Sequence, residues 1–312
     1  MKKNVLSICD LSSKQILDIL NLAEILKSPV NVEESRKQLR GRILGMVFQK
    51  PSTRTRISFE TAMLQLGGNA INLSFSDLQL SRGESIEDTA RTLSLYLDCL
   101  MARVNSHNDL EKLSQYSTIP VINGLSDLFH PCQILADLLT ISEYKKKLGG
   151  ITLAFIGDGN NICNDLLLGC SKLGININIS TPPDFEPMDW IIDTARVESK
   201  KYDSSVLITN DPFEAVKEAD VVTTDTFISI GKENEQEKRN AIFLPKYQIN
   251  DEIVKHAKRD YIFMHCLPAK RGKEVTSEII DGSHSVVWTQ AENRLHVQKA
   301  LLIKLLNQEL DD

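Results

Sequence analysis

The 312-residue sequence lacks the apolar run of about 20 residues that a membrane-spanning helix needs, and we therefore expect no membrane insertion. Residues 1–10 also lack the apolar stretch of a secretory signal, so we expect no signal peptide. The six cysteines include no Cys-x-x-Cys pair, which predicts reduced thiols rather than a disulfide framework or a zinc knuckle. Together these absences predict a cytoplasmic protein.

A surplus of basic residues is also missing. The chain has 36 Lys and Arg against 42 Asp and Glu, a formal net charge of −6. Because binding to nucleic acid depends on neutralising many phosphates, this balance argues against a nucleic-acid partner. A local basic site for one small anion remains compatible with it. The hydrophobic content of 42% is typical of a globular protein, and the length favours two domains.

Short apolar runs alternate with longer amphipathic stretches, which is typical of βαβ units around parallel sheets. No internal repeat or heptad run is present. The expected strands are 44–48, 70–73, 99–104, 120–121, 151–156, 175–179, 205–208, 221–224, 261–264 and 286–288. The expected helices include 11–27, 55–66, 86–96, 109–115, 133–147 and 292–310. We therefore predict an α/β fold with two doubly wound parallel-sheet domains.

The domain boundary is expected where three lysines and two glycines end a helix, at positions 145–150. Cations suit the negative end of a helix dipole, and glycine adopts the left-handed conformation that ends a helix. A new strand pattern begins directly afterwards. This predicts a first domain over 1–148 and a second over 149–291, with the helical segment 292–312 packing back on the first domain.

The strongest motif is Ser-Thr-Arg-Thr-Arg at 52–56, which follows an expected strand and begins an expected helix. A helix N-terminus binds phosphate through its free N–H groups, and arginine adds a bidentate grip. A helix cap with solvated arginines explains the same residues about equally well. The motif therefore predicts an anion site without proving one.

Two histidine motifs also follow expected strands. His-Pro-Cys-Gln at 130–133 begins a helix, where His130 and Gln133 can hydrogen-bond a carbonyl oxygen. His-Cys-Leu-Pro at 265–268 follows the strand 261–264. Each motif alone is compatible with a purely structural role, and a lone cysteine does not establish a nucleophile.

Gly-Asp-Gly-Asn-Asn at 157–161 resembles half of a dinucleotide-binding loop. The third glycine of that loop is missing, since Ile162 stands in its place, and the next strand carries no acidic residue at its end. The motif therefore argues against an NAD oxidoreductase. Its asparagines can hold a zwitterionic substrate, or can simply form a turn.

The segment 225–231 follows the strand 221–224 and begins with Asp225, a carboxylate that can pair with an ammonium group or cap a turn. The charged stretch 232–239 behind it is either a solvated loop or part of a lid. Near the chain end, Arg294 lies at the start of the last helix. Five such signals fall at strand-to-helix turns, where open α/β sheets bind ligands.

The motifs at 52–56, 130–133, 225–231 and 265–268 resemble, in order and spacing, those of the ornithine carbamoyltransferase family. The first two are similar to aspartate carbamoyltransferase as well, whereas the last two indicate the ornithine branch. The resemblance implies an active site in the cleft between two domains, a homotrimer, and no cofactor or metal. It also implies transfer of the carbamoyl group of carbamoyl phosphate to the δ-amine of L-ornithine, giving L-citrulline and phosphate in arginine biosynthesis or, reversed, in arginine breakdown.

The resemblance implies site residues position by position. The expected carbamoyl-phosphate ligands are Ser52, Thr53, Arg54, Thr55, Arg103, His130, Pro131, Cys132, Gln133, Cys266, Leu267 and Arg294, with Gln79 contributed to the active site of a neighbouring subunit. The expected ornithine ligands are Asn161, Asp225, Ser229 and Ile230. Thr55, Arg103, His130 and Cys266 are the expected catalytic residues.

The sequence departs from the family at Ile230, where the family usually has methionine. In the family this contact is made largely by the backbone, so ornithine binding is expected to persist. We also expect carbamoyl phosphate to bind first and residues 231–245 to close over ornithine. Two alternatives to ornithine carbamoylation are a relative that uses another amine, such as N-acetylornithine, putrescine, lysine or aspartate, and a non-catalytic anion-binding module.

Overall fold

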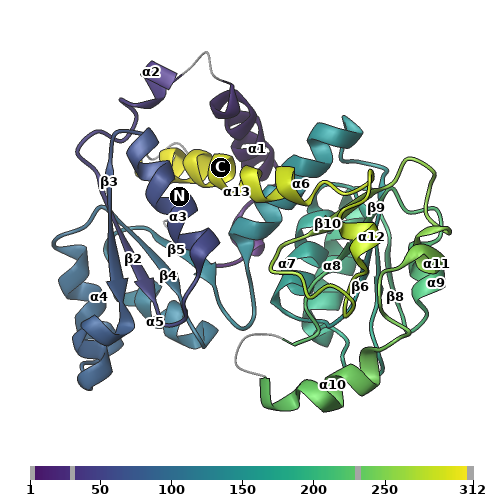
Figure 1. Cartoon of the computed structure of the whole chain (residues 1–312). Helices are drawn as coiled ribbons and strands as arrows, with labels where there is room; N and C mark the ends of the chain where they lie inside the picture. Colours follow the sequence, from purple (N-terminus) through teal and green to yellow (C-terminus); the bar gives the residue numbers. More distant parts are fainter. Residues whose placement is uncertain (1–3, 29–31, 229–232, 308–312) are drawn as a thin grey trace. The chain divides into compact units, whose positions relative to one another are not determined.

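The computed structural model describes residues 4–28, 32–228 and 233–307 and divides into two compact units (Figure 1). Unit 1 comprises Met1–Leu139 and Glu292–Asp312, and unit 2 comprises Thr140–Ala291. Each unit is built around its own five-stranded parallel sheet. The α/β class and the two parallel-sheet domains expected from the sequence are confirmed.

Unit 1 has the sheet order β1-β5-β4-β2-β3, with every neighbouring pair parallel. Its strands are β1 (Asn4–Val5), β2 (Ile43–Phe48), β3 (Asn69–Ser74), β4 (Cys99–Arg103) and β5 (Val121–Leu125). Its helices are η1 (Ile8–Asp10), α1 (Ser13–Lys27), α2 (Val32–Ser35), α3 (Thr53–Gln65), η3 (Phe75–Asp77), η4 (Gln79–Arg82), α4 (Ile86–Ser94), α5 (His107–Tyr116) and α6 (Pro131–Lys145), the last of which continues into unit 2.

Unit 2 has the sheet order β10-β9-β6-β7-β8, again entirely parallel. Its strands are β6 (Thr152–Ile156), β7 (Asn176–Ser180), β8 (Val206–Thr209), β9 (Val221–Thr224) and β10 (Ile262–His265). Its helices are α7 (Asn161–Lys172), α8 (Asp189–Lys201), α9 (Pro212–Val216), η5 (Glu233–Glu235), α10 (Gln236–Phe243), α11 (Asp251–Val254) and α12 (Ser277–Ile280), and α13 (Val287–Leu306) begins here and ends in unit 1.

The central strands are apolar because helices cover a parallel sheet on both faces. In unit 1, every residue of β4 is buried, and all of β2 after its first residue is buried. The outer strand β3 is mostly exposed or half-buried. The strands of one parallel sheet end at the same edge, so the segments that follow β2, β4 and β5 are brought together there, as are those that follow β6, β9 and β10.

The C-terminal helix packs on unit 1, as the sequence predicts. Lys27 at the end of α1 donates from Nζ to Oδ1 of Asn293 at 2.9 Å. Figure 1 shows α13, in yellow, beside α1. The side chain of Arg294 on the same helix is buried within unit 1, where it bonds residues of α3 and α6.

One expected strand is wrong. Residues 286–288 were expected to be extended because they are apolar and partly β-branched, but α13 begins at Val287. The backbone N–H of Gln290 donates to the carbonyl of Val286 at 2.9 Å, as in a first helical turn. The last helix therefore starts five residues earlier than the expected start at 292. The strand expected at 120–121 is the beginning of the longer β5.

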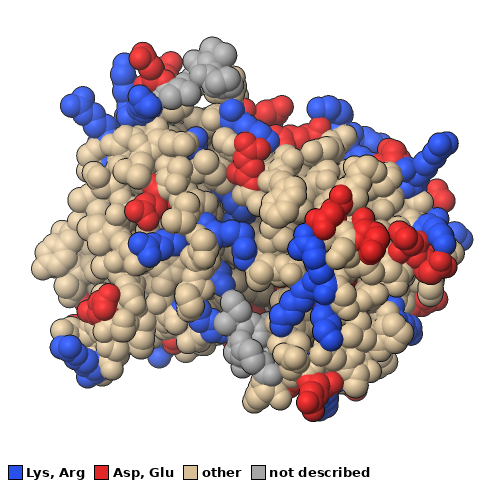
Figure 2. All heavy atoms as spheres, viewed as in Figure 1, with Lys and Arg blue, Asp and Glu red and all other residues tan. Residues whose placement is uncertain are grey.

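Within the described ranges, no helix combines the length and the apolar character needed to cross a bilayer. On the face shown in Figure 2, acidic and basic side chains are interspersed rather than gathered by sign. Cys163 and Cys170, both on α7, are buried in the core of unit 2. Burial raises the pKa of the Cys163 thiol well above its ordinary value, so this thiol stays protonated and unreactive.

Candidate active site

The N-terminus of α3 forms the first part of the candidate site. Ser52 is the N-cap, and its Oγ accepts the backbone N–H of Thr55 at 3.3 Å. Thr53, Arg54 and Thr55 form the first turn, where backbone N–H groups lack partners within the helix. The strand-then-cap order of the sequence therefore produces the anion-binding helix start that it predicts.

Positive charge gathers around His130, the residue before α6. Its side chain is buried, and its pKa lies well below the ordinary value, first because of burial and then because of Arg294, Arg103 and Arg54. Arg103 is the last residue of β4, the strand directly beside β2 in the sheet. His130 is therefore a neutral imidazole close to three guanidinium groups, an arrangement that attracts an anion and can donate a hydrogen bond to it.

Arg294 connects three elements of unit 1. Its Nη1 donates to Oε1 of Gln133 at 2.6 Å, and its Nη2 donates to Oγ1 of Thr55 at 3.3 Å. Gln133 in turn donates from Nε2 to Oδ1 of Asp137 at 2.8 Å, which orients its amide. These contacts hold the start of α3, the start of α6 and α13 in one arrangement.

The other predicted residues of unit 1 lie in different surroundings. Pro131 is the first residue of α6, and the buried Cys132 donates from Sγ to the carbonyl of Asn123 at 3.4 Å. The side chain of Cys132 therefore faces the sheet rather than the guanidinium cluster. Gln79 is exposed at the start of η4, on the segment after β3.

The candidate site residues of unit 2 meet around Asp225, which follows β9. Asn160 donates from Nδ2 to Oδ2 of Asp225 at 2.7 Å, and Cys266 donates from Sγ to Oδ1 at 3.1 Å. These residues come from the ends of β6, β9 and β10, which are neighbours in the sheet. The carboxylate is buried and accepts hydrogen bonds from two neutral donors, and a carboxylate in this position can pair with an ammonium group.

The segment after β10 is shaped by His265. The backbone N–H of Leu267 donates to Nδ1 of His265 at 2.9 Å, and Nε2 lies 3.3 Å from Oε1 of the buried Glu274. Leu267 adopts a left-handed backbone (φ 58°), which is costly for a residue with a side chain and typical of functional sites. The pair of His265 and Glu274 therefore fixes the backbone beside Cys266.

Asp225, His265 and Cys266 each offer one possible metal-ligating atom, and these atoms lie within 4.8 Å of one another. A metal ligand must present a free lone pair. Both nitrogens of His265 face partners in the chain, and Asp225 accepts the Cys266 thiol. We therefore assign the three side chains to a hydrogen-bonded arrangement.

The glycine motif after β6 serves internal packing. The backbone N–H of Gly159 donates to the carbonyl of Phe185 at 2.8 Å. A Cβ at position 159 would lie 2.5 Å from backbone atoms of residues 185–187. The chain itself thus occupies the place next to this loop, which agrees with the interpretation that the loop does not bind a dinucleotide.

Residues 3–143 match the family description "Aspartate/ornithine carbamoyltransferase, carbamoyl-P binding domain", and residues 149–305 match "Aspartate/ornithine carbamoyltransferase, Asp/Orn binding domain". The chain belongs to the aspartate/ornithine carbamoyltransferase family. The resemblance seen in the sequence motifs is confirmed over nearly the full length.

Relatives within this carbamoyltransferase family are similar along their whole length. Ornithine carbamoyltransferase from Methanosarcina acetivorans is 51% identical over 306 residues, covering 98% of this chain and 100% of the relative. The Bacillus subtilis ornithine carbamoyltransferase is 51% identical over 304 residues, covering 97% and 94%. The solved ornithine carbamoyltransferase of Pyrococcus furiosus has a TM-score of 0.92 at 50% identity, covering 96% of this chain and 95% of that one. Anabolic ornithine carbamoyltransferase from Campylobacter jejuni also has a TM-score of 0.92, at 43% identity, covering 99% and 100%.

Two residues of this carbamoyltransferase that are predicted to bind ornithine, Ser229 and Ile230, lie outside the described residues. The first two residues of the segment 231–245, which is expected to close over ornithine, also lie outside them. Two contributors were not predicted from the sequence. Asn160, rather than its neighbour Asn161, holds Asp225, whereas Asn161 begins α7 and accepts the N–H of Ile162. The double asparagine was a visible signal, but it did not indicate which of the two turns toward β9.

The second contributor is Arg239 on α10, inside a stretch that the sequence presents as a solvated charged loop. Its buried guanidinium donates to Oδ2 of Asp158 at 2.7 Å and to the carbonyl of Phe227 at 2.9 Å. It also lies over the ring of Phe185. Arg239 thus ties together the segments that follow β6, β7 and β9.

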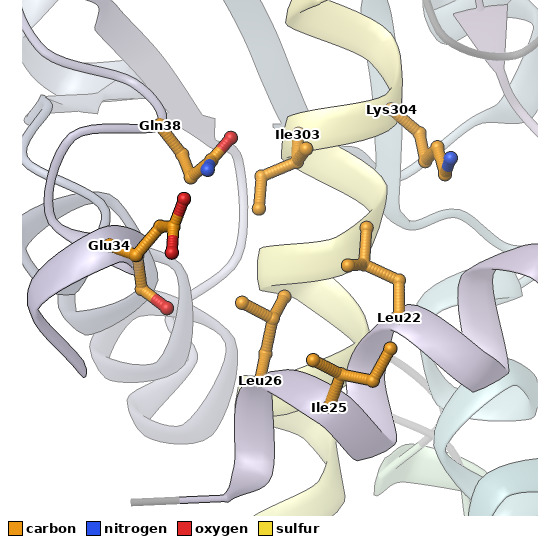
Figure 3. A pocket seen from close by; sticks show the side chains of 8 residues that line it. Leu22, Ile25, Leu26, Glu34, Gln38, Ile303 and Lys304 are labelled. Atoms are coloured by element: carbon orange, nitrogen blue, oxygen red, sulfur yellow. The ribbon is translucent and has the colours of Figure 1, made fainter. Parts of the chain in front are cut away.

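A separate cavity of about 260 Å³ lies between α1, α2 and α13 in unit 1 (Figure 3). Apolar side chains form much of its wall, among them Leu22, Leu26 and Ile303, and Glu34 and Lys304 also line it. None of the predicted site residues is among its lining residues, so we assign no part of carbamoyl transfer to it.

Proposed function

We propose that this chain is an ornithine carbamoyltransferase, which transfers the carbamoyl group of carbamoyl phosphate to the δ-amine of L-ornithine and releases L-citrulline and phosphate. Unit 1 is the carbamoyl-phosphate-binding domain and unit 2 the ornithine-binding domain in this proposal. The descriptions of the matching domains and the full-length similarity to ornithine carbamoyltransferases support it.

The phosphate of the donor binds at the start of α3, through Ser52, Thr53, Arg54 and Thr55. Free backbone N–H groups and the positive end of the helix dipole stabilise a dianion there, and the guanidinium of Arg54 adds charge-assisted hydrogen bonds. The same groups stabilise the phosphate as it leaves. Its departure therefore needs no protonation by a strong acid.

The carbamoyl oxygen receives hydrogen bonds from Arg103, His130 and Thr55, which stabilise the negative charge that develops when the amine attacks. A neutral His130 is suited to this role because it donates without adding a proton to the product. Gln133, oriented by Asp137 and Arg294, is placed to bind the carbamoyl amide. Cys266, Leu267 and Gln79 complete the proposed donor contacts.

Ornithine binds through Asp225, which pairs with the α-ammonium group, with Asn161, Ser229 and Ile230 as further ligands. Asn160 and Cys266 orient the Asp225 carboxylate. The δ-amine must lose its proton before it attacks. With a pKa near 10.4, about one molecule in 2,500 is neutral at pH 7, a cost of about 4.6 kcal/mol that the site must offset by favouring the uncharged amine. The carbamoyl carbon then forms its bond to the amine nitrogen while its bond to the phosphate oxygen breaks, and the second proton of the attacking nitrogen passes to the departing phosphate.

The observation that carries the proposal is the pair of hydrogen bonds by which Arg294 joins Thr55, in the first turn of α3, to Gln133, three residues after the buried His130. The deciding experiment assays the purified protein with carbamoyl phosphate and each of five amines: ornithine, N-acetylornithine, putrescine, lysine and aspartate. We expect citrulline from ornithine and at least about 100-fold lower kcat/KM with the others. Faster turnover of another amine would replace ornithine as the acceptor, and lack of turnover with every amine would leave only an anion-binding module.

We also infer ordered binding, with carbamoyl phosphate first. Ornithine at saturating concentration should then suppress isotope exchange between carbamoyl phosphate and phosphate, whereas equal exchange at all ornithine concentrations would exclude this order. We infer a cytoplasmic location because six cysteines that form no disulfide suit a reducing compartment.

We infer a homotrimer in which Gln79 acts in a neighbouring active site. Gln79 is exposed close to the edge strand β3. Ile71 on β3 and Ile57 and Leu64 on the adjacent α3 are exposed in the single chain. Apolar side chains next to a strand edge are typical of a surface that another subunit covers.

A further inference from the structure

A buried polar network holds the turn formed by residues 126–129, which directly precedes His130. Asn123 on β5 and Ser126 just after it are both fully buried. Asn123 donates from Nδ2 to the carbonyl of Leu6 at 2.7 Å and to the carbonyl of Phe129 at 3.2 Å. One amide therefore joins the chain's first strand segment to the residue next to His130.

Ser126 closes the turn that ends at Phe129. Its backbone N–H donates to the carbonyl of Phe129 at 3.0 Å, and its Oγ accepts the backbone N–H of Phe129 at 3.2 Å. Buried polar groups of this kind are costly unless they are paired, so the pairing specifies one conformation of the turn. His130 follows immediately, and its carbonyl accepts the N–H of Gln133 as α6 begins.

His107, the first residue of α5, holds this turn from the other side. Its Nδ1 lies 2.9 Å from Oγ of Ser126, and its backbone N–H donates to Oδ1 of Asp127 at 2.7 Å. The single proton of Ser126 Oγ has two acceptors within reach, Nδ1 of His107 at 2.9 Å and the carbonyl of Phe129 at 3.4 Å, and the shorter contact favours Nδ1. The network thus assigns His107 the neutral tautomer with its proton on Nε2.

We propose that Ser126, held by Asn123 and His107, is a positioning residue that fixes His130 at the carbamoyl group. The inference rests on the proposed role of His130 as a donor to the carbamoyl oxygen. Ser126 does not touch the substrate in this scheme. Instead, it sets the direction of the backbone from which the imidazole extends, and small misplacements of such a group reduce transition-state stabilisation strongly.

The arrangement carries a pH signature. Burial lowers the pKa of His107, although Glu111, Asp127 and Asp10 oppose this effect. The neutral form therefore predominates at pH 6.5 and above. As the pH falls below 6.5 through the lowered pKa, protonation of Nδ1 removes the acceptor of the Ser126 hydroxyl. The affinity for carbamoyl phosphate should therefore decrease.

The experiment compares Ser126→Ala with Ser171→Ala by calorimetric titration of carbamoyl phosphate. Ser171 is an equally buried serine whose hydroxyl donates to the carbonyl of Leu167 within α7. We expect about 10-fold weaker carbamoyl-phosphate binding for Ser126→Ala, unchanged binding for Ser171→Ala, and an unchanged KM for ornithine in both. Binding within twofold of the wild type in Ser126→Ala, or equal losses in both variants, would overturn the proposal.

A second pair decides the matter if Ser126→Ala does not fold. His107→Phe keeps an aromatic ring against Phe129, which the His107 ring contacts edge-on at 5.1 Å, but lacks the acceptor nitrogen. His107→Gln keeps an acceptor that cannot titrate. We expect weaker carbamoyl-phosphate binding in His107→Phe and recovery of binding in His107→Gln. The decline in affinity that the wild type shows as the pH falls below 6.5 should be absent in His107→Gln. Normal binding in both variants would overturn the proposal.

His130→Ala separates the two hypotheses. If the wild type forms citrulline and His130→Ala binds carbamoyl phosphate more weakly than the wild type, the proposed function and the role of His130 stand, and retained affinity in Ser126→Ala then refutes the positioning role alone. If the wild type itself has no affinity, the proposed function fails and this inference fails with it.

Discussion

The side chains near His130 show which features of the site the sequence predicts and which it does not. The cap serine, the arginines and the histidine were predicted at the correct strand ends because their motifs are contiguous. The bonds from Arg294 to Gln133 and Thr55 were not predictable, since they join residues 161 and 239 positions apart. Such contacts depend on how α13 packs, and local patterns do not contain that information.

The electrostatics of His130 yield a prediction at this scale. Arg294→Met removes the nearby cation with the largest effect on the pKa of His130, so this pKa should rise toward 6.5. In the wild type the imidazole stays neutral as the pH falls well below 6.5, and in the variant it should take up a proton at a higher pH. Histidine NMR titration measures the shift.

Arg91→Met serves as the control for Arg294→Met. Arg91 is exposed on α4 and pairs with Asp88 at 3.2 Å. The Arg91→Met variant should have the same His130 pKa as the wild type. A His130 pKa that is the same in Arg294→Met and the wild type would mean that burial alone sets the value.

Asp225→Asn tests the acceptor site. Loss of the negative charge should raise the KM for ornithine about 10- to 100-fold, because a hydrogen bond to a charged group contributes about 1.5–3 kcal/mol. Carbamoyl-phosphate affinity should not change. The matched control is Asp193→Asn on the exposed face of α8. Equal KM values in steady-state assays of Asp225→Asn and the wild type would remove Asp225 from ornithine binding.

Among the elements, the strands were predicted best, because buried parallel strands are short, continuous apolar runs. The same rule produced the error at 286–288, where an apolar run begins a helix whose apolar side chains are buried in a core. Neither sheet order could be predicted from local patterns. The position of Asn160 opposite Asp225 follows from that order, since β6 and β9 are neighbours although their last residues are 68 positions apart in the chain.

The charged segment after β9 was interpreted as solvated or lid-like, yet α10 is anchored through Arg239. Both Arg239 and Asp158 are buried, so Arg239→Met should lower the free energy of unfolding by about 3 kcal/mol, as expected when one member of a buried ion pair is removed. Urea unfolding measures it. Arg196→Met, at an exposed pair 3.8 Å from Asp193, should change the stability by less than about 0.5 kcal/mol. Similar values for the two variants would contradict a structural role for the buried pair.

For the whole molecule, the proposed trimer predicts complementation between subunits. Gln79→Ala and Arg103→Met chains should each have little activity as pure oligomers, because each lacks one donor contact. Unfolding and refolding them as a mixture should restore part of the activity, since some sites then combine an intact Gln79 from one chain with an intact Arg103 from another. Light scattering should give three times the mass of one 35.0 kDa chain. A monomeric mass, or a mixture no more active than its components, would contradict a shared site.

The place of Arg294 on α13 has a consequence for synthesis in the cell. Ribosomes synthesise a chain from its amino terminus. The first turn of α3 therefore leaves the ribosomal exit tunnel long before Arg294, whose guanidinium bonds Thr55. A nascent chain can fold most of both sheets and still hold an incomplete anion site. Carbamoyl transfer therefore begins only after translation has ended, and a chain that stops before α13 lacks both Arg294 and the apolar side chains that this helix buries.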